Sequence, residues 1–356
     1  MRERLLEDLL WFLERPSVTG EEKRLCDDLE ARVLRLAGWE TERVSNNLVV
    51  NRAEPDSSRD QLVFAGHLDT VPEPQSGLPV GVEGERVYGR GASDMKAGDA
   101  VMLALLENVS WEGSWAEPVF VFYEREEGPY AENGLEAVFA EAPDVLDVDL
   151  ALCLEPTAGA LEVGCVGTAQ VEITFRGKSS HSARPWQGEN AITLAGSFLA
   201  EMHEREVEEV IVEGLTFYEV LVPTMARGGR AKNVVPDEFW INVNHRFPPG
   251  KGIEDVRSVF EELLGGSASY EIVDFAPSGP VELDNPLLQR LIETGLEVRP
   301  KQAWTDVARF ALHGVPAVNF GPGENAQAHQ RNEWTSVAKL VEGQAILKRW
   351  LRSIRM

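Results

Sequence analysis

The stretch Leu62-Val63-Phe64-Ala65-Gly66-His67-Leu68-Asp69-Thr70 decides how this chain is expected to fold. An apolar run of strand length ends in a histidine and an aspartate two positions apart. Side chains alternate between the faces of a strand, so His67 and Asp69 leave it on the same side. Open α/β sheets place their ligands at the carboxyl ends of strands. A carboxylate in this place either orients a metal-binding imidazole or is an ordinary buried hydrogen-bond partner.

Chain length, net charge and cysteine content limit the possible folds and functions. With 356 residues, the chain exceeds the usual size of a single core, and two domains are expected. The net charge of -25 argues against nucleic acid or an anionic membrane surface as a partner. No apolar run approaches the roughly 20 residues of a membrane span, and the first residues predict an amphipathic helix instead of a signal peptide. Three cysteines in no motif spacing favour buried thiols and a cytoplasmic location.

Most of the chain alternates between strand-like and helical segments. Helical periods cover residues 1–14, 19–38, 94–109 and 133–141, and apolar runs of strand length lie at 48–51, 62–65, 118–123, 149–154 and 316–320. This alternation predicts an α/β fold with a mostly parallel sheet covered by helices.

The middle of the chain has a different order. Strand-like runs at 170–177, 215–222, 238–247 and 270–274 are interrupted by helical segments at 190–209 and 253–264. A β-α-β-β-α-β order is typical of a ferredoxin-like α+β unit with an antiparallel sheet. We therefore predict a discontinuous domain formed by residues 1–168 and 275–356, interrupted by an insert at 169–274.

Further acidic and imidazole residues fall just beyond predicted strands or at a predicted helix start. They are Asp94, Glu126, Glu127, Glu155 and His329. Taken singly, each has an ordinary explanation: Asp94 as a helix N-cap, or Glu126 and Glu127 as a solvated charge pair. Together they supply two imidazoles and several carboxylates without thiolates, a donor set that suits Zn²⁺, Co²⁺ or Mn²⁺.

Five motifs resemble, in order, those of the M20 family of dinuclear zinc peptidases and deacylases. They are Gly66-His67-Leu68-Asp69-Thr70, Gly91-Ala92-Ser93-Asp94-Met95-Lys96, Glu126-Glu127-Gly128, Glu155-Pro156-Thr157 and Ala328-His329. The resemblance covers nearly the whole chain. Within the family, it is nearest to the succinyl-diaminopimelate desuccinylases, particularly their actinobacterial-type branch.

The resemblance implies a role for each matching residue. Asp94 would bridge two Zn²⁺ ions, with His67 and Glu155 completing one site and Glu127 and His329 the other. Asp69 would orient His67, and Glu126 would be the general base that deprotonates a metal-bridging water. The Asp94–Met95 peptide would be cis.

The implied reaction is removal of succinate from N-succinyl-LL-2,6-diaminopimelate in lysine and diaminopimelate biosynthesis. Deacylation of another N-acyl amino acid, such as N-acetylornithine, and carboxypeptidase action remain alternatives. A non-catalytic member of the family is a further alternative, against which the intact Glu126 argues.

The resemblance also implies a homodimer formed through the insert, which would act as a lid and dimerisation domain. His181 in the insert would reach the partner subunit's site and assist catalysis there. A substrate with several carboxylates requires positive donors, preferably arginines. The candidates for substrate binding are Arg184, Arg246 and Arg309, with Asn233 and Thr305 as polar contacts.

Overall fold

The computed structural model describes residues 2–73 and 79–352, in two compact units. Unit 1 comprises 1–164, 282–299 and 305–356, and unit 2 comprises 165–281 and 300–304. The predicted domain ranges also include residues 1, 74–78 and 353–356, which lie outside the described residues. None of the helices in the described part of the chain is long and apolar enough to cross a membrane.

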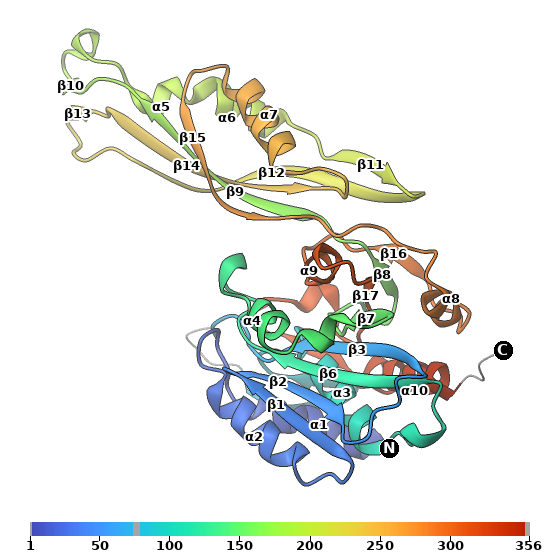
Figure 1. Ribbon diagram of the computed structural model, residues 1–356. Helices are drawn as coiled ribbons and strands as arrows, with labels where there is room; N and C mark the ends of the chain where they lie inside the picture. The colour runs from blue at the N-terminus through green and yellow to red at the C-terminus, as the bar shows by residue number, and fades with distance from the viewer. Residues whose placement is uncertain (1, 74–78, 353–356) are drawn as a thin grey trace. The chain divides into compact units, whose positions relative to one another are not determined.

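Unit 1 is built on an eight-stranded sheet (Figure 1). Its strands, in spatial order, are β1 (Trp39–Val44), β2 (Asn47–Arg52), β6 (Ala116–Tyr123), β3 (Asp60–His67), β7 (Leu150–Cys153), β17 (Ala317–Asn319), β8 (Leu161–Val163) and β16 (Val298–Pro300). The central strands β6, β3, β7 and β17 run parallel. Strand β2 pairs antiparallel with β1 and β6, and β8 pairs antiparallel with β17. The mostly parallel sheet predicted from the sequence is confirmed.

Helices cover this sheet. Those of unit 1 are α1 (Arg2–Leu13), α2 (Lys23–Val33), α3 (Lys96–Asn108), α4 (Gly134–Glu141), α8 (Pro286–Ile292), α9 (Val307–Leu312) and α10 (Val337–Arg352). Helices α1, α3 and α10 pack on one another, and α4 and α9 lie on the other side of the sheet (Figure 1). Helix α3 is buried along nearly its whole length, which explains its apolar composition. A small sheet of β18 (Trp334–Ser336), β5 (Arg86–Tyr88) and β4 (Gly81–Glu83) joins two distant parts of the chain.

Unit 2 is a five-stranded antiparallel sheet with helices. The strand order is β11 (Glu208–Val212), β12 (Leu215–Gly228), β14 (Glu238–Phe247), β9 (Gly167–Arg176) and β15 (Ser269–Ala276). The apolar side chains of α6 (Gly196–Glu204) and α7 (Ile253–Leu264) share one core with the alternate buried residues of β9 and β14. A short pair, β10 (Ser180–His181) with β13 (Val234–Val235), lies outside this sheet. The ferredoxin-like order is confirmed, with β11 as an additional edge strand.

Two predicted helices differ from the structure. The helix expected over 19–38 begins only at Lys23, because the backbone of Val18 and Thr19 pairs with Thr70 instead. The helix expected over 190–209 is divided into α5 (Ala191–Leu194) and α6, and Glu208 already belongs to β11. At the start of the first segment and at the end of the second, pairing with a bridge or strand competes successfully with local helical propensity.

Candidate metal centre

The predicted donor residues emerge at one edge of the unit 1 sheet. His67 ends β3, Glu126 and Glu127 follow β6, and Glu155 follows β7. These three strands are parallel neighbours, so their carboxyl ends lie side by side. Asp94 lies just before α3, in the loop that follows β5. The structure thus brings together side chains from four separate segments of the first half of the chain.

Two glycines, Gly98 and Gly323, allow backbone segments around the site to lie very close together. A Cβ atom added at Gly98 in α3 would lie 2.2 Å from the carbonyl oxygen of Leu154, and one at Gly323 would lie 2.1 Å from that of Ser93. Only glycine allows such approaches. The first brings the start of α3 against the end of β7, and the second brings the segment before His329 against the Asp94 loop.

The donor atoms form overlapping groups. His67, Asp94 and Glu155 offer atoms that lie within 4.8 Å of one another, and so do Asp94, Glu127 and His329. The Nε2 atom of His67 lies 3.3 Å from Oδ1 of Asp94, and Nε2 of His329 lies 3.5 Å from Oδ2 of the same carboxylate. Asp94 therefore faces both imidazoles, one with each oxygen. This geometry suits a carboxylate shared by two cations.

Glu126 lies beside these groups. Its Oε2 atom is 3.9 Å from Nε2 of His67, and its side chain is 12% exposed. Together with His67 and Glu127 it forms a third group of donor atoms within 4.8 Å. Its carboxyl group is thus positioned for proton transfer at the same place, although the geometry also permits it to bind a cation.

The imidazoles have raised pKa values. Burial lowers the pKa of His67, but its hydrogen bonds to Asp69 and Asp94 outweigh this effect and raise the pKa well above the ordinary value. The hydrogen bond to Glu127 raises the pKa of His329, and the charge of Asp94 adds to it. A proton on each ring neutralises part of the surrounding negative charge when no cation does so.

The pKa values of two carboxyl groups in the site, those of Glu126 and Glu127, are also raised. Burial raises the pKa of Glu126 well above the ordinary value, and the charges of Glu155 and Glu127 add to it against the opposing effect of His67. Burial and the charge of Asp94 raise the pKa of Glu127. Several carboxylates in a partly buried site repel one another, and bound cations relieve this repulsion.

Asp69 holds the backbone of the paired glutamates. Its Oδ1 accepts a hydrogen bond from the Glu126 amide (3.0 Å), and its Oδ2 accepts from the Glu127 amide (3.1 Å) and from Oγ1 of Thr19 (2.9 Å). The Nδ1 atom of His67 lies 3.0 Å from the backbone carbonyl oxygen of Asp69 and 3.5 Å from its carboxylate. The carboxylate of Asp69 thus holds the backbone of Glu126 and Glu127, and its role in orienting His67 stays a prediction.

Sequence reasoning missed Glu333. This buried carboxylate accepts hydrogen bonds from the backbone amides of Gly91, Ser93 and Asp94 and from the guanidinium of Arg90. It stands in Asn332-Glu333-Trp334, four residues after His329, and no motif that we recognised marks it. Its partners are more than 200 residues away in the chain, so only the fold reveals the contact.

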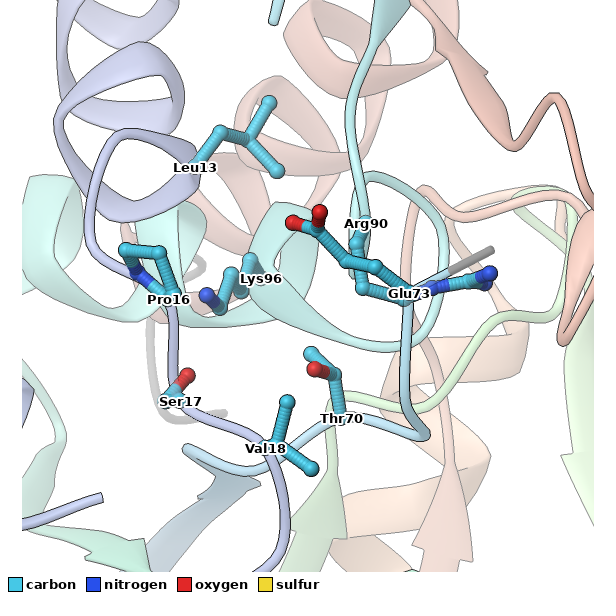
Figure 2. Close-up of a pocket in the computed structure, with 8 residues that line it drawn as sticks. All are labelled: Leu13, Pro16, Ser17, Val18, Thr70, Glu73, Arg90 and Lys96. Atoms are coloured by element: carbon cyan, nitrogen blue, oxygen red, sulfur yellow. The ribbon is translucent and has the colours of Figure 1, made fainter. Parts of the chain in front are cut away.

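A cavity of about 240 Å³ lies close to this loop but outside the donor groups (Figure 2). Its lining residues are Leu13, Pro16, Ser17, Val18, Thr70, Glu73, Arg90 and Lys96. The Lys96 ammonium donates to the carbonyl oxygens of Phe12 (3.3 Å) and Arg15 (2.9 Å), and burial lowers the pKa of Lys96 to about 8. Lys96 therefore ties the start of α3 to the end of α1, and none of the eight lining residues belongs to the donor set.

Two predicted substrate contacts lie in unit 1 and are buried. The Arg309 guanidinium donates to Oδ1 of Asp306 (2.9 Å), to Glu136 (2.7 Å) and to the Tyr130 carbonyl (2.9 Å). This network favours a structural role for Arg309 over the predicted substrate contact. Thr305 is 2% exposed, and its contact with a substrate stays a prediction.

The predicted contacts in unit 2 fall at opposite ends of its sheet. His181, Arg184 and Asn233 are exposed near the β10–β13 pair, which follows the Arg176–Glu238 end of strands β9 and β14. Arg246 pairs with Thr168 at the other end, eight residues along β14 from Glu238, or about 27 Å at the usual strand rise. Arg246 therefore cannot share one small substrate with the other three in the same unit.

Comparison with known proteins decides the family. The family model for Peptidase family M20/M25/M40 matches residues 63–353. The chain belongs to the M20 family. An M20 relative from Mycobacterium tuberculosis, named "Putative succinyl-diaminopimelate desuccinylase DapE", is 38% identical over 350 residues, which are 96% of each chain. One from Corynebacterium glutamicum, named "Succinyl-diaminopimelate desuccinylase", is 37% identical over 94% of this chain and 93% of its own.

Solved M20-like structures share the fold. The aminopeptidase PepT from Bacillus cereus superposes with a TM-score of 0.79 at 21% identity, over 99% of this chain and 98% of its own. An M20 family metallo-carboxypeptidase from Sulfolobus solfataricus superposes with a TM-score of 0.76 at 18% identity, over 98% of both chains. The predicted M20 membership, hydrolase class and two-part architecture are thus confirmed. Membership of the family implies metal binding, and the donor groups could hold a metal ion.

Proposed function

We propose that this chain is a dizinc succinyl-diaminopimelate desuccinylase. The observation that carries the substrate assignment is the 37–38% identity, over nearly the whole length, to relatives with that name. The observation that supports the chemistry is the position of Glu126 beside two overlapping donor groups in the same site.

The residues fit two cations that share Asp94. His67 and Glu155 would complete one site, and Glu127 and His329 the other, because the donor atoms of each group lie within 4.8 Å of one another. The two imidazoles face different oxygens of Asp94. Imidazole and carboxylate donors suit Zn²⁺, and Co²⁺ or Mn²⁺ could substitute. When bound, such ions polarise an amide carbonyl and make water a better acid.

Glu126 would act as general base and then as general acid. The hydrogen bond from its backbone amide to Asp69 fixes where its carboxylate can reach. The carboxylate would take a proton from the attacking water and deliver it to the leaving amine of the substrate, contributing about 10²–10⁴-fold to the rate. Succinate and LL-2,6-diaminopimelate would be the products, and synthesis of lysine and cell-wall precursors would use the diaminopimelate.

We also propose a homodimer in which His181 serves the partner subunit. His181, Arg184 and Asn233 lie at the end of the unit 2 sheet away from Arg246. A second subunit would allow the two groups of residues to act on one substrate molecule. The cytoplasmic location stays a prediction, and Cys26, Cys153 and Cys165 are all buried.

The substrate assignment is tested by comparing kcat/KM of the metal-loaded protein for three substrate classes. We expect N-succinyl-LL-2,6-diaminopimelate to exceed N-acetylornithine and unblocked dipeptides by more than about tenfold, a difference of about 1.4 kcal/mol in transition-state binding. Preference for acetylornithine would make the protein a different deacylase. Preference for dipeptides would make it a peptidase of the same family.

Mixing two inactive variants tests the shared site. His181→Ala and Glu126→Gln subunits, combined in equal amounts and allowed to exchange, would form mixed dimers with one site that contains both native residues. We expect recovery of about a quarter of the native activity for random pairing in a two-fold dimer. No recovery above the separate variants, although mixed dimers form, would show that His181 does not act across subunits.

A further inference from the structure

We propose that Glu333 is a positioning residue that fixes Asp94 for metal binding and connects it to the segment carrying His329. This inference rests on the proposed metal site but not on the proposed substrate. Neither Glu333 nor Arg90 belongs to the predicted donor or substrate residues, and neither is a member of the three donor groups.

The Glu333 carboxylate is surrounded by donors. Its Oε1 accepts hydrogen bonds from the Ser93 amide (2.8 Å) and the Asp94 amide (3.0 Å), and its Oε2 accepts from the Gly91 amide (2.9 Å) and Nη1 of Arg90 (2.9 Å). The residue is 1% exposed. Each oxygen thus accepts two hydrogen bonds, and three of the four donors are backbone amides of the loop that ends at Asp94.

A buried carboxylate with this many donors resists replacement by an amide. Hydrogen bonds to an ionised acceptor are roughly twice as strong as those between neutral groups. Glutamine has the same shape, but its NH₂ group would face either the Ser93 and Asp94 amides or the Gly91 amide and Arg90. The glutamine NH₂ group would then face two N–H groups that have lost their acceptor, so the loop would have to move.

Two residues that flank His329 in the sequence, Glu324 and Trp334, are hydrogen-bonded to the same loop. Oγ of Ser93 donates to the Trp334 carbonyl (2.8 Å) and accepts from the Glu324 amide (3.0 Å). Strand β18, which begins directly after Glu333, pairs with β5, which ends directly before Gly89. His329 is therefore held between Glu324 and Glu333, each attached to the loop that presents Asp94.

This attachment sets the distance between two proposed ligands. Oδ2 of Asp94 lies 3.5 Å from Nε2 of His329, and the two residues belong to the same donor group. Loss of the Glu333 contacts would free the Asp94 backbone and the His329 segment to separate. The effect is expected on cation binding first, and on turnover only as its consequence.

Titration of the full-length apoprotein with Co²⁺, followed by visible absorption, tests this role. For Glu333→Gln, we expect at least tenfold weaker Co²⁺ binding and an altered absorption spectrum of the bound ion. Asp8→Asn is the matched control, since Asp8 is an equally buried carboxylate (1% exposed) that accepts a hydrogen bond from Arg32 on helix α2. It should bind Co²⁺ within about twofold of the native chain and with the native spectrum.

Native Co²⁺ affinity and spectrum in a folded Glu333→Gln variant would overturn the proposal. If that variant does not fold, Arg90→Met removes one of the four donors, and we expect the same spectral change with a two- to fivefold loss of affinity. A native spectrum and affinity there would overturn it equally. A native chain that binds Co²⁺ but does not release succinate would overturn the substrate assignment alone, because the Glu333 comparison depends only on metal binding.

Discussion

Replacement of Asp69 by Asn should reduce catalysis without unfolding the protein. The carboxylate receives the Glu126 amide on one oxygen and the Glu127 amide on the other. An Asn side chain has one acceptor oxygen, so whichever way it turns, one of these two amides loses its partner. A hydrogen bond to a charged acceptor contributes about 1.5–3 kcal/mol. If that energy is lost from the transition state, turnover falls by about ten- to a hundredfold.

The assay is the steady-state rate of succinate release by the metal-loaded variant, together with its metal content and circular dichroism. Thr19→Val is the matched control, because it removes only the neutral hydroxyl donor to Asp69 and leaves both glutamate amides paired. Because this bond does not hold the backbone of the paired glutamates, we expect a loss in turnover of less than about fivefold, or about 1 kcal/mol in the transition state, for this control. A rate for Asp69→Asn within threefold of the native value, or an equal loss in both variants, would refute the reasoning.

Three further predictions address the base, the cations and a buried acid. Glu126→Gln should lower kcat by about 10²–10⁴-fold while two cations remain bound, as measured by metal analysis; near-native turnover would exclude Glu126 as the base. Chelation should abolish activity and lower Tm, with Zn²⁺ or Co²⁺ restoring both, since a ligand at a hundred times its Kd stabilises by about 2.7 kcal/mol; activity that survives complete metal removal would contradict this. Asp99 is fully buried, neither of its carboxylate oxygens has a hydrogen-bond partner among the described residues, and burial raises its pKa well above the ordinary value. The stability contributed by its protonated form is present below the unfolded pKa of about 3.9 and is lost as pH rises toward the folded pKa. Asp99→Asn should therefore raise Tm more at pH 8 than at pH 4.5, by at least about 2 °C; an equal change at both values would contradict the assignment.

The sequence predicted the sheet well because its central strands carry uninterrupted apolar runs. Leu62–His67 of β3 is buried on both faces, as a strand between helical layers must be. The edge strand β1 was missed, since Trp-Glu-Thr-Glu-Arg-Val is half charged and exposed on alternate residues. An amphipathic edge strand of this kind resembles a loop when only the sequence is known.

The site was predictable to the extent that its donors stand in short motifs. The motifs identified His67, Asp94, Glu127, Glu155 and His329 as candidates, and the structure places them together. The contacts of Asp69 with the amides of Glu126 and Glu127, and of Glu333 with the Asp94 loop, could not be predicted in this way. They join side chains to backbone amides, and backbone amides leave no trace in the residue types of a sequence.

The long separations within the donor set have a consequence for folding. Glu127 and His329 are 202 residues apart, and Asp94 and Glu333 are 239 residues apart, with the whole of the insert between them. Closing loops of this length in an unfolded chain costs conformational entropy. The proposed site of Asp94, Glu127 and His329 needs segments from both sides of the insert, whereas that of His67, Asp94 and Glu155 needs only segments before it. We therefore expect uptake of the second cation during refolding to report the joining of the two parts of unit 1.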